Sequence, residues 1–350
     1  MALADEGRFA GPDMLVSVQE NTDVASARRT ALALALKLGF NEEDSGAVAV
    51  IATEAASNLV KHGGGGDLIV RDATFGARRL LEVIAIDRGR GMTSIARCFE
   101  DGYSTAGSPG TGLGAISRLS KLHDVYSIPE KGTVLIAQAE SRAPAGEGSG
   151  NPQGIEVGAI NIPYPGEEIS GDSWTSHVSA DRARFMIADG LGHGVFAAEA
   201  AMAAIRFASD SRNPKPTDVI ESGHLGLRST RGAAVGVADI DFRAGIVMFA
   251  GVGNVAAAVV SEGGAKRQMV SINGTLGHQM VRARQYDYPF PPGSLLIMHS
   301  DGLSANWSFE KYPGLFRSHP SVIAGVLFRD FRRTRDDATV VVARRRGPGT

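Results

Sequence analysis

The chain contains a single cysteine, Cys98, among its 350 residues. One cysteine excludes an internal disulfide, and it is too few for a structural zinc site built on thiolates. Cysteine usage of this kind is typical of a reducing compartment, so the sequence predicts a cytoplasmic protein.

Long apolar runs and an excess of basic charge are also missing. No segment approaches the roughly 18 to 20 apolar residues that a membrane-spanning helix needs. The first residues include Asp5 and Glu6 where a signal peptide would carry a basic region. Lys and Arg total 36 against 38 Asp and Glu, which gives a net charge of −2. We therefore expect neither a membrane nor a nucleic acid as a partner.

The composition is that of a globular protein, with 43% hydrophobic and 21% charged residues. A length of 350 residues allows two or three domains. Residues 141–154 lack apolar periodicity and are rich in Gly, Pro and Ser, which is typical of a linker. The sequence thus predicts three parts, with boundaries at 1–140, 141–154 and 155–346.

In the second half, aspartates stand where apolar runs meet glycine-rich turns. Residues 185–188 are apolar and lead into Asp189, which Gly190, Gly192 and Gly194 follow in alternation. A short apolar run bounded by glycine predicts a buried strand. Three further positions share this pattern of an acid at a predicted strand end: Asp172, Asp301 and Asp336. Asp-Gly pairs are also ordinary turn residues, but four acids in this setting favour an oxygen-rich pocket for Mg²⁺ or Mn²⁺.

These motifs resemble the SpoIIE/RsbX branch of the metal-dependent Ser/Thr phosphatases, the PPM family, over about residues 154–346. The segment 250–254, Ala-Gly-Val-Gly-Asn, is closest in form to RsbX. Ser170 departs from the pattern, because many relatives carry glycine there. The resemblance implies an α/β/β/α sandwich and two metal ions, with catalysis centred on Asp189. The implied metal ligands are Asp172, Asp189, Gly190 through its carbonyl, Asp301 and Asp336. His193 fits a proton donor, a helix cap or a solvated side chain.

The first half carries a different set of polar motifs. Glu54, Asn58 and His62 are spaced i, i+4, i+8 on a predicted helix, so they share one face. Asn58 offers an oxygen to a metal and Glu54 a base, although a solvated polar ridge would look the same. A predicted strand then ends at Asp87, which is followed by Gly89 and Gly91.

A glycine-rich loop with Gly110, Gly112 and Gly114 precedes another predicted helix. Its backbone amides, together with the helix N-terminus, suit a phosphate chain. The loop is neither a Rossmann fingerprint, because no strand immediately precedes it, nor a Walker A loop, because no Gly-Lys-Ser/Thr closes it. A flexible turn is the competing interpretation.

In this order the motifs resemble the N box and the two glycine boxes of GHKL ATPases. Residues 101–105, Asp-Gly-Tyr-Ser-Thr, resemble the RsbT-type anti-sigma-factor kinases. The resemblance covers about residues 12–140 and implies a GHKL (Bergerat) α/β sandwich that binds ATP. Asn58 would coordinate Mg²⁺, with His62 beside the nucleotide, and Asp87, Gly89 and Gly91 would bind adenine. Gly110, Gly112 and Gly114 would cover the phosphates, and Glu54 would be the general base.

Together the resemblances predict a bacterial signalling enzyme of mixed α/β class that both phosphorylates and dephosphorylates Ser/Thr. The implied substrate is a STAS-domain protein of a sigma-factor partner-switching pathway of the stress response, with a sigma factor as a further possible partner. The alternative is a phosphatase whose ATP-binding half only sequesters a partner. A histidine-kinase ATPase half is disfavoured, because no helix pair carrying a phosphoacceptor His precedes Glu54.

Overall fold

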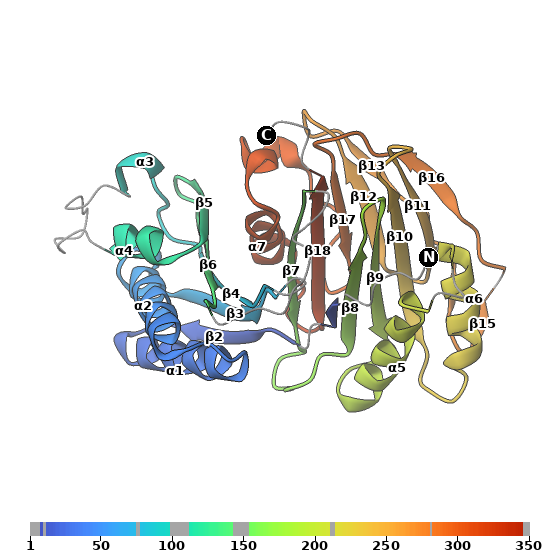
Figure 1. The fold of residues 1–350 in the computed structure, drawn as a ribbon, viewed down its shortest axis with the longest axis horizontal. Helices are drawn as coiled ribbons and strands as arrows, with labels where there is room; N and C mark the ends of the chain where they lie inside the picture. The colour runs from blue at the N-terminus through green and yellow to red at the C-terminus, as the bar shows by residue number, and fades with distance from the viewer. Residues whose placement is uncertain are drawn as a thin grey trace. The chain divides into compact units, whose positions relative to one another are not determined.

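The structure is a computed structural model, and it describes residues 8–9, 12–74, 78–98, 112–142, 154–210, 214–280 and 282–345. The chain divides into two compact units, one of Asp13–Gly150 and one of Met1–Pro12 with Asn151–Thr350. Figure 1 colours the chain along its length. No helix in the described ranges is both long and apolar enough to cross a bilayer. The predicted loop residue Gly110, the segment 101–105 and most of the predicted linker lie outside the described residues.

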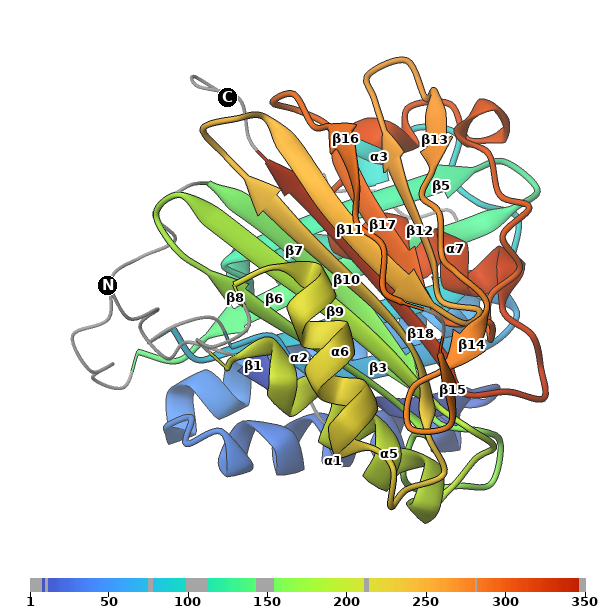
Figure 2. The same cartoon turned by 90° about the vertical axis from the view of Figure 1, so that its right-hand side faces the viewer.

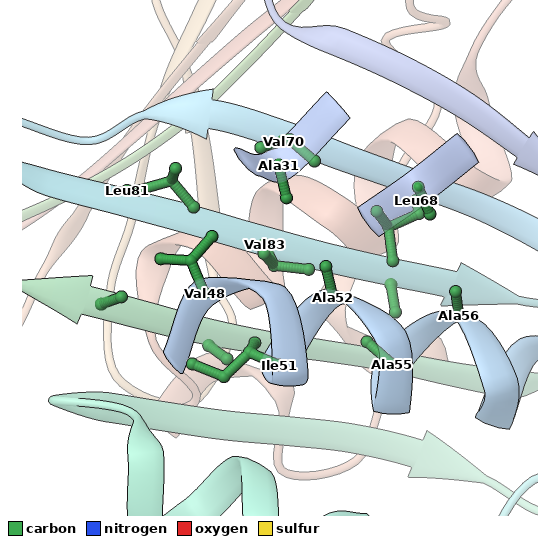
Figure 3. Packing of buried hydrophobic residues seen from close by; sticks show 14 of the residues in the cluster. Ala31, Val48, Ile51, Ala52, Ala55, Ala56, Leu68, Val70, Leu81 and Val83 are labelled. Atoms are coloured by element: carbon green, nitrogen blue, oxygen red, sulfur yellow. The ribbon is translucent and has the colours of Figure 1, made fainter. Parts of the chain in front are cut away.

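The unit that begins at Asp13 is a five-stranded antiparallel sheet with helices on one face. The strand order is β2 (Met14–Val18), β3 (Gly66–Asp72), β4 (Leu80–Asp87), β6 (Gly132–Glu140) and β5 (Leu122–Ile128). The helices are α1 (Asn21–Lys37), α2 (Glu42–Asn58), α3 (Ile95–Cys98) and α4 (Gly112–Leu119). Figure 3 shows how small side chains of α2, such as Ala52 and Ala55, bring this helix close to Leu68 and Val83 of the sheet.

Local sequence explains both ends of α2. The side chain of the N-cap residue Asn41 accepts a 2.8 Å hydrogen bond from the backbone N–H of Asp44, and three acids occupy the first turn. At its other end α2 widens into a π-helical turn, Leu59–Gly63, before Gly64 adopts a left-handed conformation. Such turns often occur at functional sites. Here the turn carries His62.

The second unit contains two antiparallel sheets. The six-stranded sheet has the order β1 (Arg8–Phe9), β8 (Asp172–Val178), β9 (Arg182–Gly190), β10 (Ala233–Asp241), β11 (Ile246–Val252) and β16 (Tyr286–Pro289). The five-stranded sheet has the order β13 (Lys266–Gln268), β12 (Ala256–Val260), β17 (Leu295–His299), β18 (Ala338–Arg345) and β7 (Ile155–Ile162). A short hairpin joins β14 (Gly274–Thr275) to β15 (Gln279–Met280).

These sheets form the two inner layers of an α/β/β/α sandwich, which confirms the predicted fold class. One apolar core lies between them, with Trp174 and Phe185 from one sheet and Leu296 and Val341 from the other. The outer layers are α5 (Val195–Ile205) and α6 (Pro216–Gly226) on the six-stranded sheet, as Figure 2 shows, and α7 (Pro320–Phe331) on β7 and β18.

The first strand is placed differently from the predicted domain boundaries. β1 pairs with β8, with Arg8 opposite Ser176 and Phe9 opposite Thr175. The segment before Pro12 therefore groups with the C-terminal unit, whereas the sequence assigned residues 1–140 to one domain. The sequence could not predict the place of β1, because this strand pairs through backbone groups with a strand that is distant in the sequence.

Candidate functional sites

A cavity of about 310 Å³ lies in the N-terminal unit between α2, β4 and the start of α4. Five predicted residues line it: Asn58, His62, Asp87, Gly91 and Gly112. Most of the other lining residues are apolar, among them Leu59, Met92 and Leu135. A largely apolar cavity with a few fixed polar groups suits a ligand that combines a flat ring with a charged end.

Asp87 is the last residue of β4, and its carboxylate is oriented by the backbone around it. Its Oδ1 accepts hydrogen bonds from the N–H of Gly89 at 2.8 Å and from the N–H of Thr133 at 3.1 Å. Two donors on one oxygen fix the carboxylate plane at the cavity wall. A carboxylate held in this way can accept a hydrogen bond from the exocyclic amino group of a bound base.

Gly91 allows a close approach that a larger residue would block. Its φ is +66°, and a Cβ built there would lie 2.2 Å from the carbonyl oxygen of Ile128. The β5–β6 turn can therefore pack directly on the loop after Asp87. Pro129 and Glu130 of this turn line the cavity.

Glu54 and Asn58 meet the start of α4. A Cβ on Gly112 would lie 2.7 Å from Oε2 of Glu54 and 3.7 Å from Oδ1 of Asn58. The helix begins at Gly112, so Gly112 and the buried Gly114 lie in its first turn, whereas the sequence placed them in the preceding loop. Free backbone N–H groups of a first helical turn favour an anion. The carboxylate of Glu54 and the amide oxygen of Asn58 therefore lie next to the N-terminus of α4.

His62 is half-buried in the cavity wall. Burial lowers the pKa of its imidazole, and the nearby charges of Arg90 and Lys61 lower it further. The ring is therefore neutral at physiological pH, and it can either donate or accept a hydrogen bond.

The second site lies in the C-terminal unit, where four predicted carboxylates come together. Asp172, the first residue of β8, stands directly opposite Asp189 near the end of β9. Asp301 follows β17, and Asp336 precedes β18. Gly190 ends β9 and donates its N–H to the carbonyl of Gly171 at 3.1 Å.

The pKa values of three of these carboxyls reflect their crowding. Burial raises the pKa of Asp189 to about 9, and the charges of Asp172, Asp301 and Asp336 add to the effect. Burial likewise raises the pKa of Asp172 to about 7, although the hydroxyls of Ser300 and Thr339 oppose it. The pKa of Asp336 is also raised, by burial and then by Asp301 and Asp337. Carboxyls crowded in this way lose their protons readily only when a cation binds between them.

Two side chains that the sequence analysis did not assign hold this cluster in place. Oδ1 of the buried Asp337 accepts hydrogen bonds from the N–H of Tyr164 at 2.8 Å and from the N–H of Gly171 at 2.9 Å. Asn254 donates a short hydrogen bond from Nδ2 to Oδ2 of Asp301. Only their sequence neighbours could have identified these two residues. Asp337 follows Asp336, and Asn254 ends the Gly-Val-Gly-Asn segment.

The donor set fits a hard divalent cation. Oδ2 of Asp172 and Oδ2 of Asp189 are buried and have no hydrogen-bond partner. Carboxylate oxygens without donors are the ligands that Mg²⁺ and Mn²⁺ prefer. Among the described residues, no three His, Cys, Asp or Glu side chains are already closed around a common ion position.

His193 lies beside this cluster but is engaged with a neighbouring loop. Its ring stacks on Tyr164 with centroids 4.4 Å apart, and its Nδ1 lies 3.1 Å from Oε1 of Glu167. Because Tyr164 is in turn bonded to Asp337, these contacts connect the glycine-rich loop after Asp189 to the carboxylates.

Comparisons with known proteins match both halves of the chain. Residues 18–139 match the family Histidine kinase-like ATPase domain, and residues 179–346 match Stage II sporulation protein E (SpoIIE). Serine/threonine-protein kinase RsbT of Bacillus subtilis (strain 168) is 30% identical over 122 residues, which are 35% of this chain and 92% of RsbT.

Solved structures resemble the C-terminal half. A structure from work on the bacterial stressosome, a modular system adapted to control secondary messenger signaling, is 27% identical with a TM-score of 0.50. It covers 54% of this chain and 99% of its own. RsbX in complex with magnesium is 23% identical with a TM-score of 0.47, covering 54% of this chain and 94% of its own.

The chain thus joins a histidine-kinase-like ATPase domain to a SpoIIE-type phosphatase domain of PPM fold. Through its ATPase domain the chain belongs to the RsbT family.

Proposed function

We propose that the C-terminal domain hydrolyses phosphoserine or phosphothreonine on a protein substrate with two Mg²⁺ or Mn²⁺ ions. The observation that carries this proposal is the facing pair Asp172 and Asp189, whose inner oxygens are buried without donors. Asp172, Asp189, Asp301 and Asp336 would hold the ions, with the carbonyl of Gly190 as a further ligand. Bound divalent ions supply positive charge to the phosphoryl oxygens and lower the pKa of a water.

The chain's own residues hold the carboxylates in position. Asp337 fixes the backbone before Asp172 through Gly171, and Asn254 orients Asp301. Asp172 and Asp189 lie in paired strands of one sheet, and Asp301 and Asp336 lie in the turns next to β17 and β18 of the other, so the geometry does not depend on a single loop. Rigid placement of charge is the main requirement of phosphoryl transfer.

The test is phosphate release from a phosphorylated STAS-domain protein of the same organism, with Mn²⁺ or Mg²⁺ present. We expect the wild type to release phosphate and Asp189→Asn to be at least about a hundredfold slower, because one ligand and its charge are lost. Asp287→Asn, which changes an exposed aspartate on β16, is the matched control and should keep full activity. Full activity of Asp189→Asn with Mn²⁺ would contradict the proposal.

For the N-terminal domain we propose ATP binding and transfer of the γ-phosphate to a Ser/Thr of a STAS-domain protein. The supporting observation is that Gly112 brings the start of α4 within reach of both Glu54 and Asn58. Asn58 would hold Mg²⁺ on the nucleotide, and Glu54 would accept the hydroxyl proton of the substrate. Asp87, Gly89, Gly91 and His62 would line the base and ribose, with Gly110, Gly112 and Gly114 over the phosphates.

The kinase proposal is tested with labelled ATP in the Asp189→Asn background, so that the phosphatase does not remove the product. We expect transfer to the STAS-domain protein, and at least about a hundredfold less transfer in Glu54→Gln with nucleotide binding retained. Nucleotide-dependent binding of the STAS-domain protein or of a sigma factor without any transfer would favour the binding module instead.

A further inference from the structure

Arg231 lies in the turn before β10, where it approaches the glycine-rich loop that follows Asp189. The guanidinium of Arg231 lies over the ring of Phe196, 5.1 Å from its centroid. Its Nη1 lies 3.1 Å from where a Cβ on Gly192 would be, so the guanidinium packs closely against the glycine-rich loop after Asp189. Stacking of this kind holds a guanidinium without neutralising it.

The backbone around Arg231 is anchored as well. The carbonyl oxygen of Arg231 lies 2.9 Å from Nε2 of His278. The next residue, Gly232, accepts a 3.0 Å hydrogen bond from the N–H of Leu191. Both ends of the side chain are therefore held in place, which lowers the entropic cost of binding a ligand.

The position of Arg231 relative to the carboxylates follows from the strand register. Asp189 pairs with Ala234, three residues after Arg231, and Gly192 comes three residues after Asp189. Three residues span at most about 10 Å. Arg231 thus lies close in the chain to the edge of the site, within reach of a residue that flanks the phosphorylated one.

The chemistry of this edge is cationic and apolar. Arg231 is exposed, and it forms no ion pair with any described residue. Around it Leu191, Val195 and Phe196 are exposed apolar side chains, Phe196 to 61%. An exposed guanidinium beside apolar side chains suits an acidic side chain of a peptide substrate.

We propose that Arg231 is a positioning and specificity-determining residue that binds an acidic side chain next to the phosphoserine of the protein substrate. Phe196 and Val195 give the same segment an apolar surface to lie on. A planar guanidinium pairs with a carboxylate through two parallel hydrogen bonds, which fixes the orientation of the peptide as well as its affinity. This proposal rests on the phosphatase activity proposed above.

The test compares three substrates of the full-length chain with Mn²⁺: p-nitrophenyl phosphate, a phosphoserine peptide with flanking Asp or Glu, and the same peptide with Asn or Gln instead. We expect the wild type to prefer the acidic peptide. Arg231→Gln should raise KM for that peptide about fivefold at unchanged kcat, and should remove the preference. Arg231→Lys should recover part of it, because charge returns without the planar pairing. Arg228→Gln, an exposed arginine three residues earlier, is the matched control.

Each outcome decides the question. An unchanged preference in Arg231→Gln would overturn the proposal, and so would an equal loss on p-nitrophenyl phosphate, since Arg231 would then act on the phosphoryl group. If the wild type hydrolysed none of the substrates, the phosphatase proposal would fail by itself. Equilibrium binding of the labelled peptides would then still test Arg231: tighter binding of the acidic peptide by wild type, but not by Arg231→Gln, is the supporting result.

Discussion

Among single residues, Asp337 has the greatest structural influence on the phosphatase site. Its carboxylate accepts two backbone hydrogen bonds, one of them from Gly171 immediately before Asp172. Hydrogen bonds to a buried carboxylate are stronger than neutral ones, and a donor left without its acceptor loses stability. Asp337 therefore acts on Asp172 through the backbone.

We expect Asp337→Ala to lower the free energy of unfolding of the phosphatase domain by about 3 kcal/mol, because two buried N–H groups lose their acceptor. Asp337→Asn keeps an oxygen at that position and should cost about 1 kcal/mol. The measurement is denaturant unfolding followed by tryptophan fluorescence, since both tryptophans of the chain, Trp174 and Trp307, are buried in this domain. Equal losses in the two variants would show that the bonds to Tyr164 and Gly171 do not matter.

The sequence could predict some of these residues and not others. Asp172, Asp189, Asp301 and Asp336 could be identified because each interrupts or borders an apolar strand pattern. The bond between Asp337 and Gly171 joins residues 166 positions apart. Such a contact depends on how two sheets stack, and the stacking of Arg231 on Phe196 likewise depends on a helix reaching a strand end. Local patterns carry no information about either.

At the scale of elements, the ATP-type cavity depends on short segments that must approach closely. The π-helical turn after α2 places His62, the early start of α4 places Gly112, and the loop 87–91 packs against the β5–β6 turn. The helix that carries Glu54, Asn58 and His62 and the strand that ends at Asp87 were predictable from the pattern of their residues. The start of α4 at Gly112 was not, because glycine is a poor helix former and local propensity favoured a loop.

Gly91→Ala should weaken binding of Mg-ATP at least about tenfold, since the new Cβ would meet the carbonyl of Ile128 and the residue would keep a left-handed φ. The same strain should cost about 2 kcal/mol of stability. Titration calorimetry and far-UV circular dichroism measure the two effects.

The matched control is Gly46→Ala, on an exposed face of α2 where a Cβ meets nothing within 4 Å. Alanine there should stabilise the helix by about 0.5 to 1 kcal/mol and leave nucleotide affinity unchanged. Unaltered binding in Gly91→Ala would mean that the loop does not shape the cavity.

At the scale of the whole molecule, two units of different architecture carry two different sites. The order of motifs was enough to predict an ATPase-like sandwich followed by a phosphatase sandwich. It was not enough to predict that β1 joins the sheet of the C-terminal unit, because a strand pairs through backbone groups that every residue has. The units also differ in tryptophan content, so fluorescence reports the phosphatase unit alone.

This difference allows a test of the carboxylate cluster by pH. In the folded, metal-free domain the pKa of Asp172 is raised to about 7 and that of Asp189 to about 9, from 3.8 when unfolded. A raised carboxyl pKa means that the folded state holds its proton more tightly than the unfolded chain does. The resulting stability is present in acid and is lost as pH rises through the folded values.

After removal of metal with EDTA, the tryptophan-detected unfolding temperature should therefore fall between about pH 4 and 9, because each proton that only the folded state holds costs about 1.4 kcal/mol of stability per pH unit. Asp172 and Asp189 both contribute up to about pH 7, and Asp189 alone contributes from there to about pH 9. Asp189→Asn should make this slope shallower, because asparagine does not titrate and only Asp172 then binds a proton more tightly in the folded state. Saturating Mn²⁺ should remove or reverse the slope, since an ion binds the deprotonated carboxylates and binds them better as pH rises. If the stability of the metal-free domain instead rose with pH over this range, Asp172 and Asp189 would already be ionised in the folded state. Their pKa values would then not be raised by burial and by each other's charge.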